Sequence, residues 1–523
     1  MILCTLWGDC LDSLSYSFTG ELESIIKFCK SVDRIYLYGA GRIGKKYVEY
    51  LVGNGIRPAG FIVTECTSDM VDDYYVWQAS EIKDSLLANE GIIATFKGAQ
   101  ESYIRSKLGG KPRIYVPKNE LHTIFNLELN VFPFLKQVFR HRPVMKPIQE
   151  WSNILIIRID VLGDSIMSTA FIREVRKSCP QSRISLIVRS SNELLFKDCP
   201  YISDLFLYEC DDTEGQENLS SENLKSLWQK AEQFIKKETL VQYDVVFHLC
   251  SLLNGRGALE ALMLGYATGS ACQIGRIYAW KENIAKNDYL RSKFSATMSY
   301  ISYDMMPKHE TACMLDMLCG CGGIVKNKKL ELWINDSEIS YRLLADKFGI
   351  NKQKEWIAVG IVGRRPSQCW PAYRYRQFFE VIGKTYDVGF IILGGNEARD
   401  TADYIKNGLN AMVIDLTGKT TLKQAMVVMK NCLFYVGANT GLMHMAAALE
   451  KPVLEISNYV RSEDGQENSP MGPWGTKSVV LQKYGIDGCR GACSKDYPHC
   501  ITQISVQEVV EATRNMILSA INN

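Results

Sequence analysis

The sequence contains no uninterrupted apolar run of the roughly 18 residues that a membrane-spanning helix requires, which argues against an integral membrane protein. It contains no excess of either charge, because 60 basic residues face 58 acidic ones and leave a net charge of +2. That balance removes any global argument for nucleic-acid binding. The N-terminal segment carries Asp9 and Asp12 and no basic stretch, so we expect no signal peptide. These absences predict a cytoplasmic protein, with peripheral contact to the inner face of the cytoplasmic membrane left open.

A disulfide framework is also missing, since the 17 cysteines are an odd number and most of them stand inside apolar runs. This usage fits reduced, buried thiols. One cluster combines three thiols with the adjacent His499, at Cys489, Cys493 and Cys500. Such a group predicts either a structural zinc or iron site, or reduced thiols that hold a loop without metal.

Strand-like apolar runs alternate with helical segments along most of the chain, which predicts an α/β fold with parallel sheets. With 523 residues, 46% of them hydrophobic and 23% charged, the chain has room for about three domains. We expect a small α/β module at residues 1–118, a linker at 119–150, and larger α/β domains at 151–335 and 336–523. Two successive Rossmann-like domains would place the carboxyl ends of both sheets on a shared cleft, which suits a two-substrate transfer enzyme.

The first module contains a glycine-rich turn between a strand at residues 34–38 and a helix. Its glycines are Gly39, Gly41 and Gly44. They suit a helix N-terminus that faces a phosphate, and Glu65 follows the second strand near the position of a ribose-binding acid. The alternative is that the glycines only allow helix and strand to pack closely. The stretch resembles Rossmann-like nucleotide-binding modules, but a single motif leaves both interpretations open and assigns no cofactor.

The predicted linker carries a basic cluster among large apolar residues. Its cations are Lys136, Arg140, His141, Arg142 and Lys146. One interpretation is an amphipathic segment that rests on anionic lipid headgroups. The other is a solvated basic face on an interdomain linker, which is favoured because Pro133, Pro143 and Pro147 should interrupt a helix.

The stretch NILIIRIDVLGDSIMSTA, residues 153–170, predicts a strand that passes directly into a helix. Residues 154–159 form a β-branched apolar run of the kind that is buried on both faces of a sheet. Gly163 should allow a tight turn, and residues 165–177 have the spacing of a helix. Asp164 then falls at the carboxyl end of the strand, where open α/β sheets bind ligands. The alternative is that Asp164 only serves as the N-cap of the helix.

A second stretch, YVGANTGLMHMAAALEKPVLEIS at residues 435–457, repeats this passage from a buried strand to a helix. Free backbone N–H groups and the positive end of the helix dipole predict an anion site there. Gly441 would let a phosphate approach the backbone, Thr440 adds a hydroxyl donor, and His444 lies one turn further along. Against this, Asn439 or Thr440 is a good N-cap in any helix, and an internal histidine is often a core residue.

Together, the two stretches resemble the bacterial heptosyltransferases, with the segments LGGNE, LTGKTTL and SQCWP between them. The resemblance extends over about residues 153–512 and implies the GT-B fold, in which two Rossmann-like domains face a cleft. It implies an inverting, metal-independent transfer of a sugar from a nucleotide-diphosphate donor. The sugar and donor that it favours are heptose and ADP-heptose. The acceptor would be a hydroxyl of lipopolysaccharide core or of another glycan, lipid-linked or protein molecule. The alternative from another class is a non-catalytic protein that binds sugar nucleotides or assists assembly.

The resemblance also implies roles for particular residues. Asp164 matches the catalytic base that deprotonates the acceptor hydroxyl, and no cofactor is required. The donor-binding positions are matched by Arg158 beside the base, by Glu397 at the ribose, by Thr420 at the nucleoside, and by Thr440, Gly441, Leu442 and His444 at the pyrophosphate. Helix dipole and cations would stabilise the departing diphosphate.

Two positions depart from the family pattern. Asn439 stands where family members usually carry Asp, and Gln368 stands two residues before Trp370, where they usually carry Lys or Arg. Because an unneutralised pyrophosphate is costly, we expect Arg364 or Arg365 to supply the missing cation. An exposed loop without a ligand is the alternative for this arginine pair.

Overall fold

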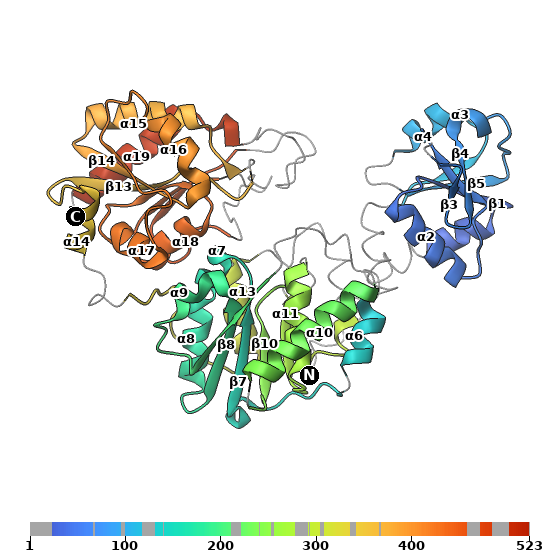
Figure 1. Ribbon diagram of the computed structural model, residues 1–523, viewed down its shortest axis with the longest axis horizontal. Coiled ribbons are helices and arrows are strands. Elements are labelled where there is room, and N and C mark those ends of the chain that lie inside the picture. Colours follow the sequence, from blue (N-terminus) through green and yellow to red (C-terminus); the bar gives the residue numbers. More distant parts are fainter. Residues whose placement is uncertain are drawn as a thin grey trace, which may run out of the picture. The chain divides into compact units, whose positions relative to one another are not determined.

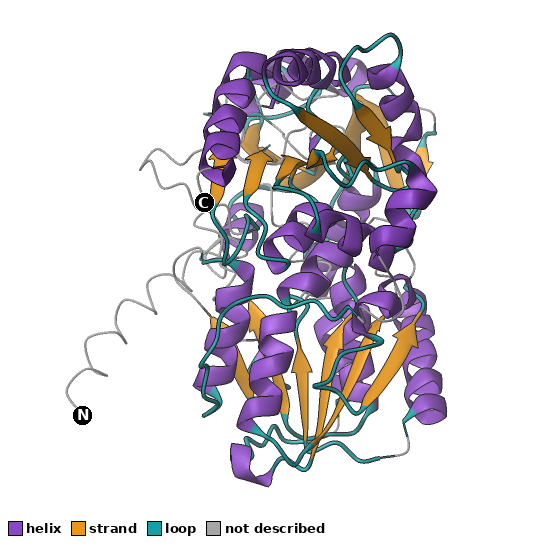
Figure 2. Ribbon diagram, turned by 90° about the vertical axis from the view of Figure 1, so that its left-hand side faces the viewer, coloured by secondary structure: helices purple, strands orange, loops and turns teal. Residues whose placement is uncertain are grey.

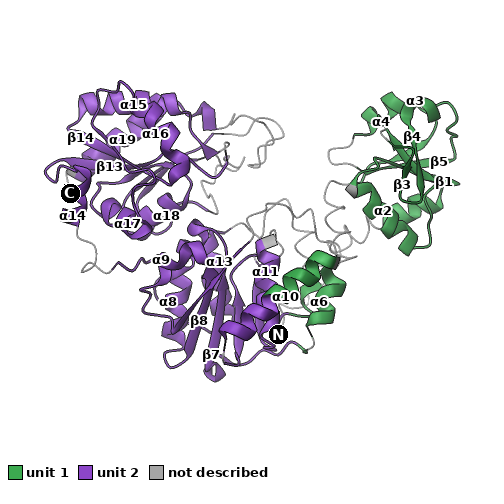
Figure 3. Ribbon diagram, in the orientation of Figure 1, with its two compact units in different colours: residues 1–142, 215–230, 280–297 green, residues 143–214, 231–279, 298–523 purple. Residues whose placement is uncertain are grey.

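Contacts between residues divide the chain into two units, shown in different colours in Figure 3. The first comprises residues 1–142, 215–230 and 280–297, and the second comprises residues 143–214, 231–279 and 298–523. The computed structural model describes residues 23–65, 68–95, 100–117, 131–139, 141–210, 221–239, 241–252, 256–277, 291, 293–303, 308–334, 341–365, 368–457, 471–483 and 501–521.

The first unit contains a six-stranded sheet with the order β3-β4-β2-β1-β5-β6, in which β3 and β4 are antiparallel and the other neighbours are parallel. Alternate residues of β1 face opposite sides. Leu37 packs with helix α2 on one face, whereas Tyr36 packs with α3 and α4 on the other. The strands are β1 Arg34–Tyr38, β2 Gly60–Val63, β3 Met70–Val71, β4 Tyr74–Gln78, β5 Glu90–Ala94 and β6 Arg113–Tyr115. The helices are α2 Arg42–Gly53, α3 Ala79–Ile82, α4 Glu101–Leu108 and α6 Phe132–Val138.

The second unit contains two six-stranded sheets whose neighbouring strands are all parallel (Figure 1 and Figure 2). The sheet with order β12-β11-β10-β7-β8-β9 consists of β7 Asn153–Arg158, β8 Arg183–Arg189, β9 Asp204–Tyr208, β10 Val245–His248, β11 Gln273–Ile277 and β12 Tyr300–Tyr303. The sheet with order β15-β14-β13-β16-β17-β18 consists of β13 Glu355–Gly360, β14 Val388–Leu393, β15 Val413–Asp415, β16 Tyr435–Ala438, β17 Val453–Ile456 and β18 Ser478–Leu481.

The helices of the second unit lie between these strands along the chain. They are α7 Leu162–Met167, α8 Thr169–Ser178, α9 Glu193–Phe196, α11 Arg256–Ala267, α13 Glu310–Gly320, α14 Tyr341–Phe348, α15 Ala372–Thr385, α16 Arg399–Lys406, α17 Leu422–Lys430, α18 Gly441–Ala448 and α19 Val506–Ile521, with α10 Ser221–Glu238 shared between the units. Short 3₁₀ helices occupy η2 Ile148–Glu150, η3 Ser190–Asn192, η7 Asn396–Ala398 and η8 Ile501–Gln503. The predicted α/β class is confirmed, whereas the predicted domain boundaries stay predictions.

The chain reverses the direction of strand addition at β7 in one sheet and at β13 in the other. β7 lies between β8 and β10, and β13 lies between β14 and β16. In open parallel sheets, ligands bind outside the carboxyl ends of the strands at such a reversal. Asp164 follows β7, and Thr440 follows β16. Both predicted centres of chemistry therefore lie at the topological switch points.

One hydrophobic core runs through both sheets of the second unit. It includes Ile156 of β7 and Phe171 of α8, and it continues to Met426 of α17 and Met443 of α18. Each of these side chains is at most 1% exposed, so the contact between the two Rossmann-like folds is built as firmly as their interiors. This shared core is what brings the helices after β7 and β16 together.

The helix after β7 differs from the prediction. It begins at Leu162 instead of residue 165, it includes Gly163, and it is divided at Ser168 into α7 and α8. The prediction of a tight turn at Gly163 is therefore wrong. Val161 occupies the N-cap position and has no capping side chain, so the start of the helix left no recognisable signal in the sequence.

The basic segment around residues 131–142 also differs from the prediction. Pro133 lies in the first turn of helix α6, where a missing backbone N–H costs nothing, so it does not interrupt the helix. Phe134 and Leu135 are buried, and the ring of Phe132 packs against Phe294 with centroids 5.6 Å apart. Protein thus covers these apolar side chains, while contact of the basic segment with lipid headgroups stays a prediction. Among the described helices of the whole chain, none has the length and apolar character to cross a bilayer.

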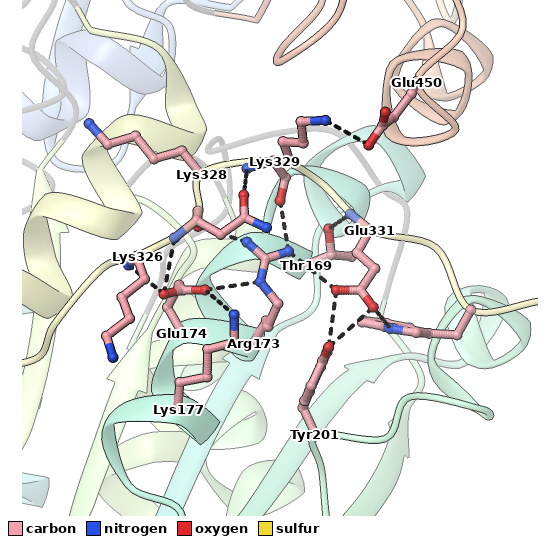
Figure 4. A network of polar contacts seen from close by, with 12 residues as sticks. Thr169, Arg173, Glu174, Lys177, Tyr201, Lys326, Lys328, Lys329, Glu331 and Glu450 are labelled. Atoms are coloured by element: carbon pink, nitrogen blue, oxygen red, sulfur yellow. Dashed lines mark hydrogen bonds and ion pairs between the residues drawn. The ribbon is translucent and has the colours of Figure 1, made fainter.

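Two neighbouring residues of α8 anchor the segment that joins the two Rossmann-like folds (Figure 4). The buried carboxylate of Glu174 accepts hydrogen bonds from the backbone N–H groups of Lys326 (2.7 Å) and Asn327 (3.4 Å). The guanidinium of Arg173 donates to the carbonyl oxygens of Asn327 (2.7 Å) and Lys329 (2.9 Å). These bonds, together with Arg173, hold the pKa of Glu174 below its usual value although burial opposes this.

Candidate active site

Asp164 lies in the first turn of α7, directly after β7, and its side chain is 23% exposed. The N-cap position of this helix belongs to Val161, so Asp164 does not serve as the cap. The division of the helix leaves the carbonyl oxygen of Asp164 available, because the N–H of Ser168 donates to the carbonyl oxygen of Ser165 at 3.2 Å. The carbonyl oxygen of Asp164 instead accepts from Nε (3.1 Å) and Nη2 (3.0 Å) of Arg158.

Arg158 is the centre of a buried cluster of charges. Its Nη1 lies 3.1 Å from Oδ2 of Asp160, and its Nη2 lies 2.9 Å from Oε1 of Glu310 and 3.5 Å from Oδ1 of Asp164. Arg276 pairs with the same oxygen of Glu310. Arg158 is only 1% exposed and its guanidinium is directed at protein groups. This geometry favours a role in positioning Asp164 over the predicted direct contact with the donor.

The pKa of Asp164 lies near neutral pH. Burial is the main cause and raises the pKa of Asp164 to about 7, Arg158 opposes this, and Asp160 and Glu310 raise it further. Glu310 behaves differently, because Arg276 and Arg158 outweigh its burial and lower its pKa. Asp164 is thus the carboxyl group of the cluster that is suited to accept a proton at physiological pH.

The opposite side of the site is the N-terminus of α18. Thr440 is its N-cap, and within the described structure the Oγ1 of Thr440 has no hydrogen-bond partner. Nδ1 of His444 is likewise buried without a hydrogen-bond partner among the described residues. Burial, with a smaller contribution from His309, lowers the pKa of His444 to about 3. His444 is therefore neutral and would act on an anion through an N–H group, not through a charge.

Two glycines allow α7 and α18 to approach each other. A Cβ atom on Gly163 would lie 2.8 Å from Cδ2 of His444, and one on Gly441 would lie 2.9 Å from Cδ2 of Leu162. Real Cβ atoms essentially never lie closer than 3.0 Å to another heavy atom, so a larger residue at either position would make His444 or Leu162 shift. Leu162 fills the space beside Gly441, while a backbone contact between Gly441 and a phosphate stays a prediction. Leu442, the next residue, is partly buried against the shared core.

The predicted nucleoside-binding residues lie on neighbouring loops. Glu397 is exposed in η7 after β14, where its carboxylate accepts from the N–H of Gly395 at 3.2 Å. Thr420 is partly buried in the loop after β15. The N–H of Gly418 donates to the carbonyl oxygen of Gly394 at 2.9 Å, which joins the two loops. The structure therefore brings Glu397 and Thr420 to the same edge of the sheet.

Arg364 and Arg365 are exposed in the loop after β13. The side chain of Gln368 accepts from the backbone N–H of Arg365 at 3.0 Å, so Gln368 organises this loop from within. Both guanidinium groups belong to a loop at the carboxyl end of the central strand, the edge where the nucleoside and pyrophosphate residues gather.

The predicted metal cluster, Cys489, Cys493 and Cys500, lies outside the described residues and stays a prediction. Among the residues that the structure does describe, no group of three or more His, Cys, Asp or Glu side chains is arranged to hold a metal ion.

The glycine-rich turn of the first module follows β1. Gly39 has a positive φ of 117°, and a Cβ on Gly44 would lie 2.2 Å from the carbonyl oxygen of Gly39. The positive φ explains Gly39 and close packing explains Gly44, while Gly41 has nothing within 4 Å of its Cβ position. Nucleotide binding by this turn stays a prediction.

Comparison with known proteins agrees with this geometry. The family model described as "Glycosyltransferase family 9 (heptosyltransferase)" matches residues 326–485. This part of the chain is therefore similar to glycosyltransferase family 9. Lipooligosaccharide heptosyltransferase 2 of Haemophilus ducreyi is 28% identical over 163 residues, which cover 29% of this chain and 44% of that protein. Lipopolysaccharide heptosyltransferase 2 of Escherichia coli K12 is 28% identical over 197 residues, which cover 36% and 53%. The chain thus spans about half the length of these curated relatives.

A solved structure supports the fold. The glycosyl transferase family 9 protein of Veillonella parvula superposes with a TM-score of 0.55 at 18% sequence identity, over 72% of this chain and 99% of that one. The predicted GT-B fold is confirmed by this likeness and by the two parallel sheets.

The structure accounts for one departure from the family 9 pattern. Nδ2 of Asn439 donates to Oε1 of Glu455 (2.9 Å) and to the carbonyl oxygen of Met471 (2.7 Å). Glu455 is fully buried, and its burial raises its pKa to about 7, although the hydrogen bond from Asn439 opposes this. An ionised Asp at position 439 could make neither of these donations. Asn439 is therefore matched to a buried carboxyl group that the sequence motif does not include.

Asn439→Asp should lower the free energy of unfolding by about 1–3 kcal/mol at pH 8, because it loses two donors and sets a second carboxyl group against Glu455. At pH 5 the loss should be smaller. In the variant, the paired carboxyl groups of residues 439 and 455 have higher pKa values in the folded state than in the unfolded state. The loss of stability therefore grows as the pH rises. Urea denaturation at both pH values tests this, with the exposed Asn407→Asp as the control for the same chemical change. Equal losses in the two variants at pH 8 would refute the pairing.

The sequence alone does not reveal the partners of Arg158. Glu310 opens α13 and Arg276 lies on β11, each more than 100 residues from Asp164. One signal was present: Arg276 stands within the run QIGRI, every residue of which is buried. His309, next to Glu310, was missed as well, and its ring stacks on Trp474 with centroids 4.4 Å apart.

Proposed function

We propose that the chain is an inverting glycosyltransferase. It transfers a sugar from a nucleotide-diphosphate donor, heptose from ADP-heptose in the first instance, to a hydroxyl of lipopolysaccharide core or of another glycan or protein. The observation that carries the proposal is the position of Asp164. It stands at the switch point after β7 with a pKa near 7, and α7 packs directly against the N-terminal end of α18.

In this proposal Asp164 takes the proton of the acceptor hydroxyl as the oxygen attacks the anomeric carbon. A sugar hydroxyl is a weak nucleophile, and a positioned base contributes about 10²–10⁴-fold. The bond to the diphosphate breaks on the opposite face of the sugar, which inverts the configuration. The N–H groups at the start of α18, the hydroxyl of Thr440 and the N–H of His444 would stabilise the charge on the leaving diphosphate.

Removal of both loop cations, Arg364→Ala with Arg365→Ala, should raise KM for the nucleotide sugar about 10-fold or more with little change in kcat. The reason is that charge-assisted contacts to the diphosphate are present before and during the transfer. Steady-state kinetics with varied donor measure the effect, and Arg376→Ala, which removes a partly exposed cation on α15, is the control. An unchanged KM in the double variant would show that the loop does not replace the cation missing at Gln368.

The test of the whole proposal is acceptor-dependent turnover. Thermal denaturation with ADP, UDP and GDP first identifies the nucleotide, because a ligand at 100 times its Kd adds about 2.7 kcal/mol. Release of that diphosphate from its sugar nucleotide, with and without lipopolysaccharide core acceptor, then measures transfer. Binding without turnover would favour the non-catalytic sugar-nucleotide protein.

A further inference from the structure

Two buried arginines share two acceptors beside Asp164. Arg158 Nη1 donates to the carbonyl oxygen of Leu249 at 2.5 Å, and Arg276 Nε donates to the same oxygen at 2.9 Å. Oε1 of Glu310 accepts from Nη2 of both guanidinium groups, at 2.9 Å from Arg158. Glu310 is 2% exposed, and Arg158 and Arg276 are 1% and 2% exposed. Like charges this close remain buried only with a counter-ion between them, and Glu310 is that counter-ion.

The guanidinium of Arg158 also contacts Asp164, the proposed base. Nε and Nη2 of Arg158 grip the carbonyl oxygen of Asp164, and its Nη2 also faces the Asp164 carboxylate. Glu310 fixes this Nη2 from the other side. The orientation of α7, and with it that of the Asp164 carboxylate, therefore depends on a side chain that opens α13.

We propose that Glu310 is a positioning residue for the transfer reaction: through Arg158 it fixes the orientation of Asp164, and its charge sets the basicity of Asp164. This inference rests on the proposed function of Asp164. Glu310 itself touches no substrate in this account, because it is enclosed by Arg158 and Arg276.

The charges around Asp164 predict in which direction its pKa changes when Glu310 loses its charge. Arg158 and Arg276 favour its ionised form, and Asp160 and Glu310 disfavour it. From the neighbouring elements, Cys250 faces Arg158 and Asp160, and the neutral rings of His309 and His444 face Glu310. Replacing the charge of Glu310 by a neutral amide would leave both arginines to act on Asp164. Its proton would then be lost at lower pH.

The experiment compares Glu310→Gln with Glu174→Gln in the full chain. Glu174 is an apt control, because it is also a fully buried glutamate paired with an arginine, but it anchors the joining segment and does not touch the cluster. Both variants should lose stability. In Glu310→Gln alone, the acidic limb of the pH profile of kcat/KM should move down by on the order of one pH unit. Its plateau kcat should fall about 10-fold or more, because a misplaced base loses rate steeply. ADP affinity, measured by calorimetry, should stay the same.

Glu310→Asp separates charge from position and serves if Glu310→Gln does not fold. It keeps the negative charge but is too short to bridge both guanidinium groups, so kcat should fall while the acidic limb stays in place. If Glu310→Gln has the pH profile and kcat of Glu174→Gln, the inference is overturned. It is also overturned if Glu310→Asp has wild-type kcat. An active Asp164→Asn enzyme would instead refute the proposed function, so the two failures are distinguishable.

Discussion

An Asp164→Asn enzyme should turn over about 10²–10⁴-fold more slowly than the wild type and bind ADP with nearly the same affinity. Asn keeps the size of the side chain but cannot accept the proton of the acceptor hydroxyl. The N–H groups and hydroxyl that we assign to the diphosphate belong to α18, which this change does not alter. Steady-state kinetics of diphosphate release and calorimetry with ADP measure the two properties separately.

The fold of this variant should not suffer at neutral pH. Burial raises the pKa of Asp164 from 3.8 to about 7, so ionisation of the group costs stability as the pH rises through that interval. Asn removes this cost, and the melting temperature at pH 8 should equal or exceed that of the wild type.

Asp160→Asn is the matched control for the base. Asp160 pairs with the same arginine, at 3.1 Å, but lies before α7. It should lower kcat by less than 10-fold, because it is not the proton acceptor in this account. If Asp160→Asn loses as much turnover as Asp164→Asn, the base is not assigned to Asp164 alone.

Arg158→Met should lower the free energy of unfolding by about 3–5 kcal/mol at pH 8, because it leaves buried carboxylates without their cation. The control is Arg183→Met. Arg183 also contacts a carboxylate through two nitrogens, that of Asp204 at 2.8 and 2.6 Å, but its side chain is 53% exposed. Its loss should be within about 0–1 kcal/mol.

The two arginine variants should also differ in pH dependence. Without Arg158, the pKa values of Asp164 and Glu310 rise in the folded state, so stability is retained at low pH and lost as the pH increases. Urea denaturation at pH 5 and pH 8 measures this. A loss in Arg158→Met that is as small as in Arg183→Met would show that Arg158 is not the centre of the cluster.

The strands were predictable because their signal is local. The run of residues 154–159 is buried on both faces, and β7 occupies all but its last residue. The start of the following helix was not predictable, because Val161 gives no capping signal. Gly163 does not form the predicted turn, because its role is to allow packing against a distant segment. It is small because His444, almost three hundred residues further along the chain, occupies the space of its side chain.

The motif residues of the candidate site were predictable from the sequence. The side chains that hold them in place were not. Asp164 and Thr440 stand out because strand, turn and helix follow one another in the sequence. Arg158 was recognised, but its partners Glu310 and Arg276 come from elements that only the folded sheet brings near it. Burial within one helix or strand leaves a periodic pattern of apolar residues in the sequence. Ion pairs between distant elements leave no such pattern.

Inverting transfer with Asp164 as the base is tested by the anomeric configuration of the product, determined by nuclear magnetic resonance after reaction of ADP-heptose with a lipopolysaccharide core acceptor. We expect the wild-type protein to form a heptosyl product of inverted configuration at C1, and Asp164→Asn to form it at least 100-fold more slowly because the general base is lost. A product of retained configuration, or ADP-heptose that is bound but never transferred, would contradict this expectation.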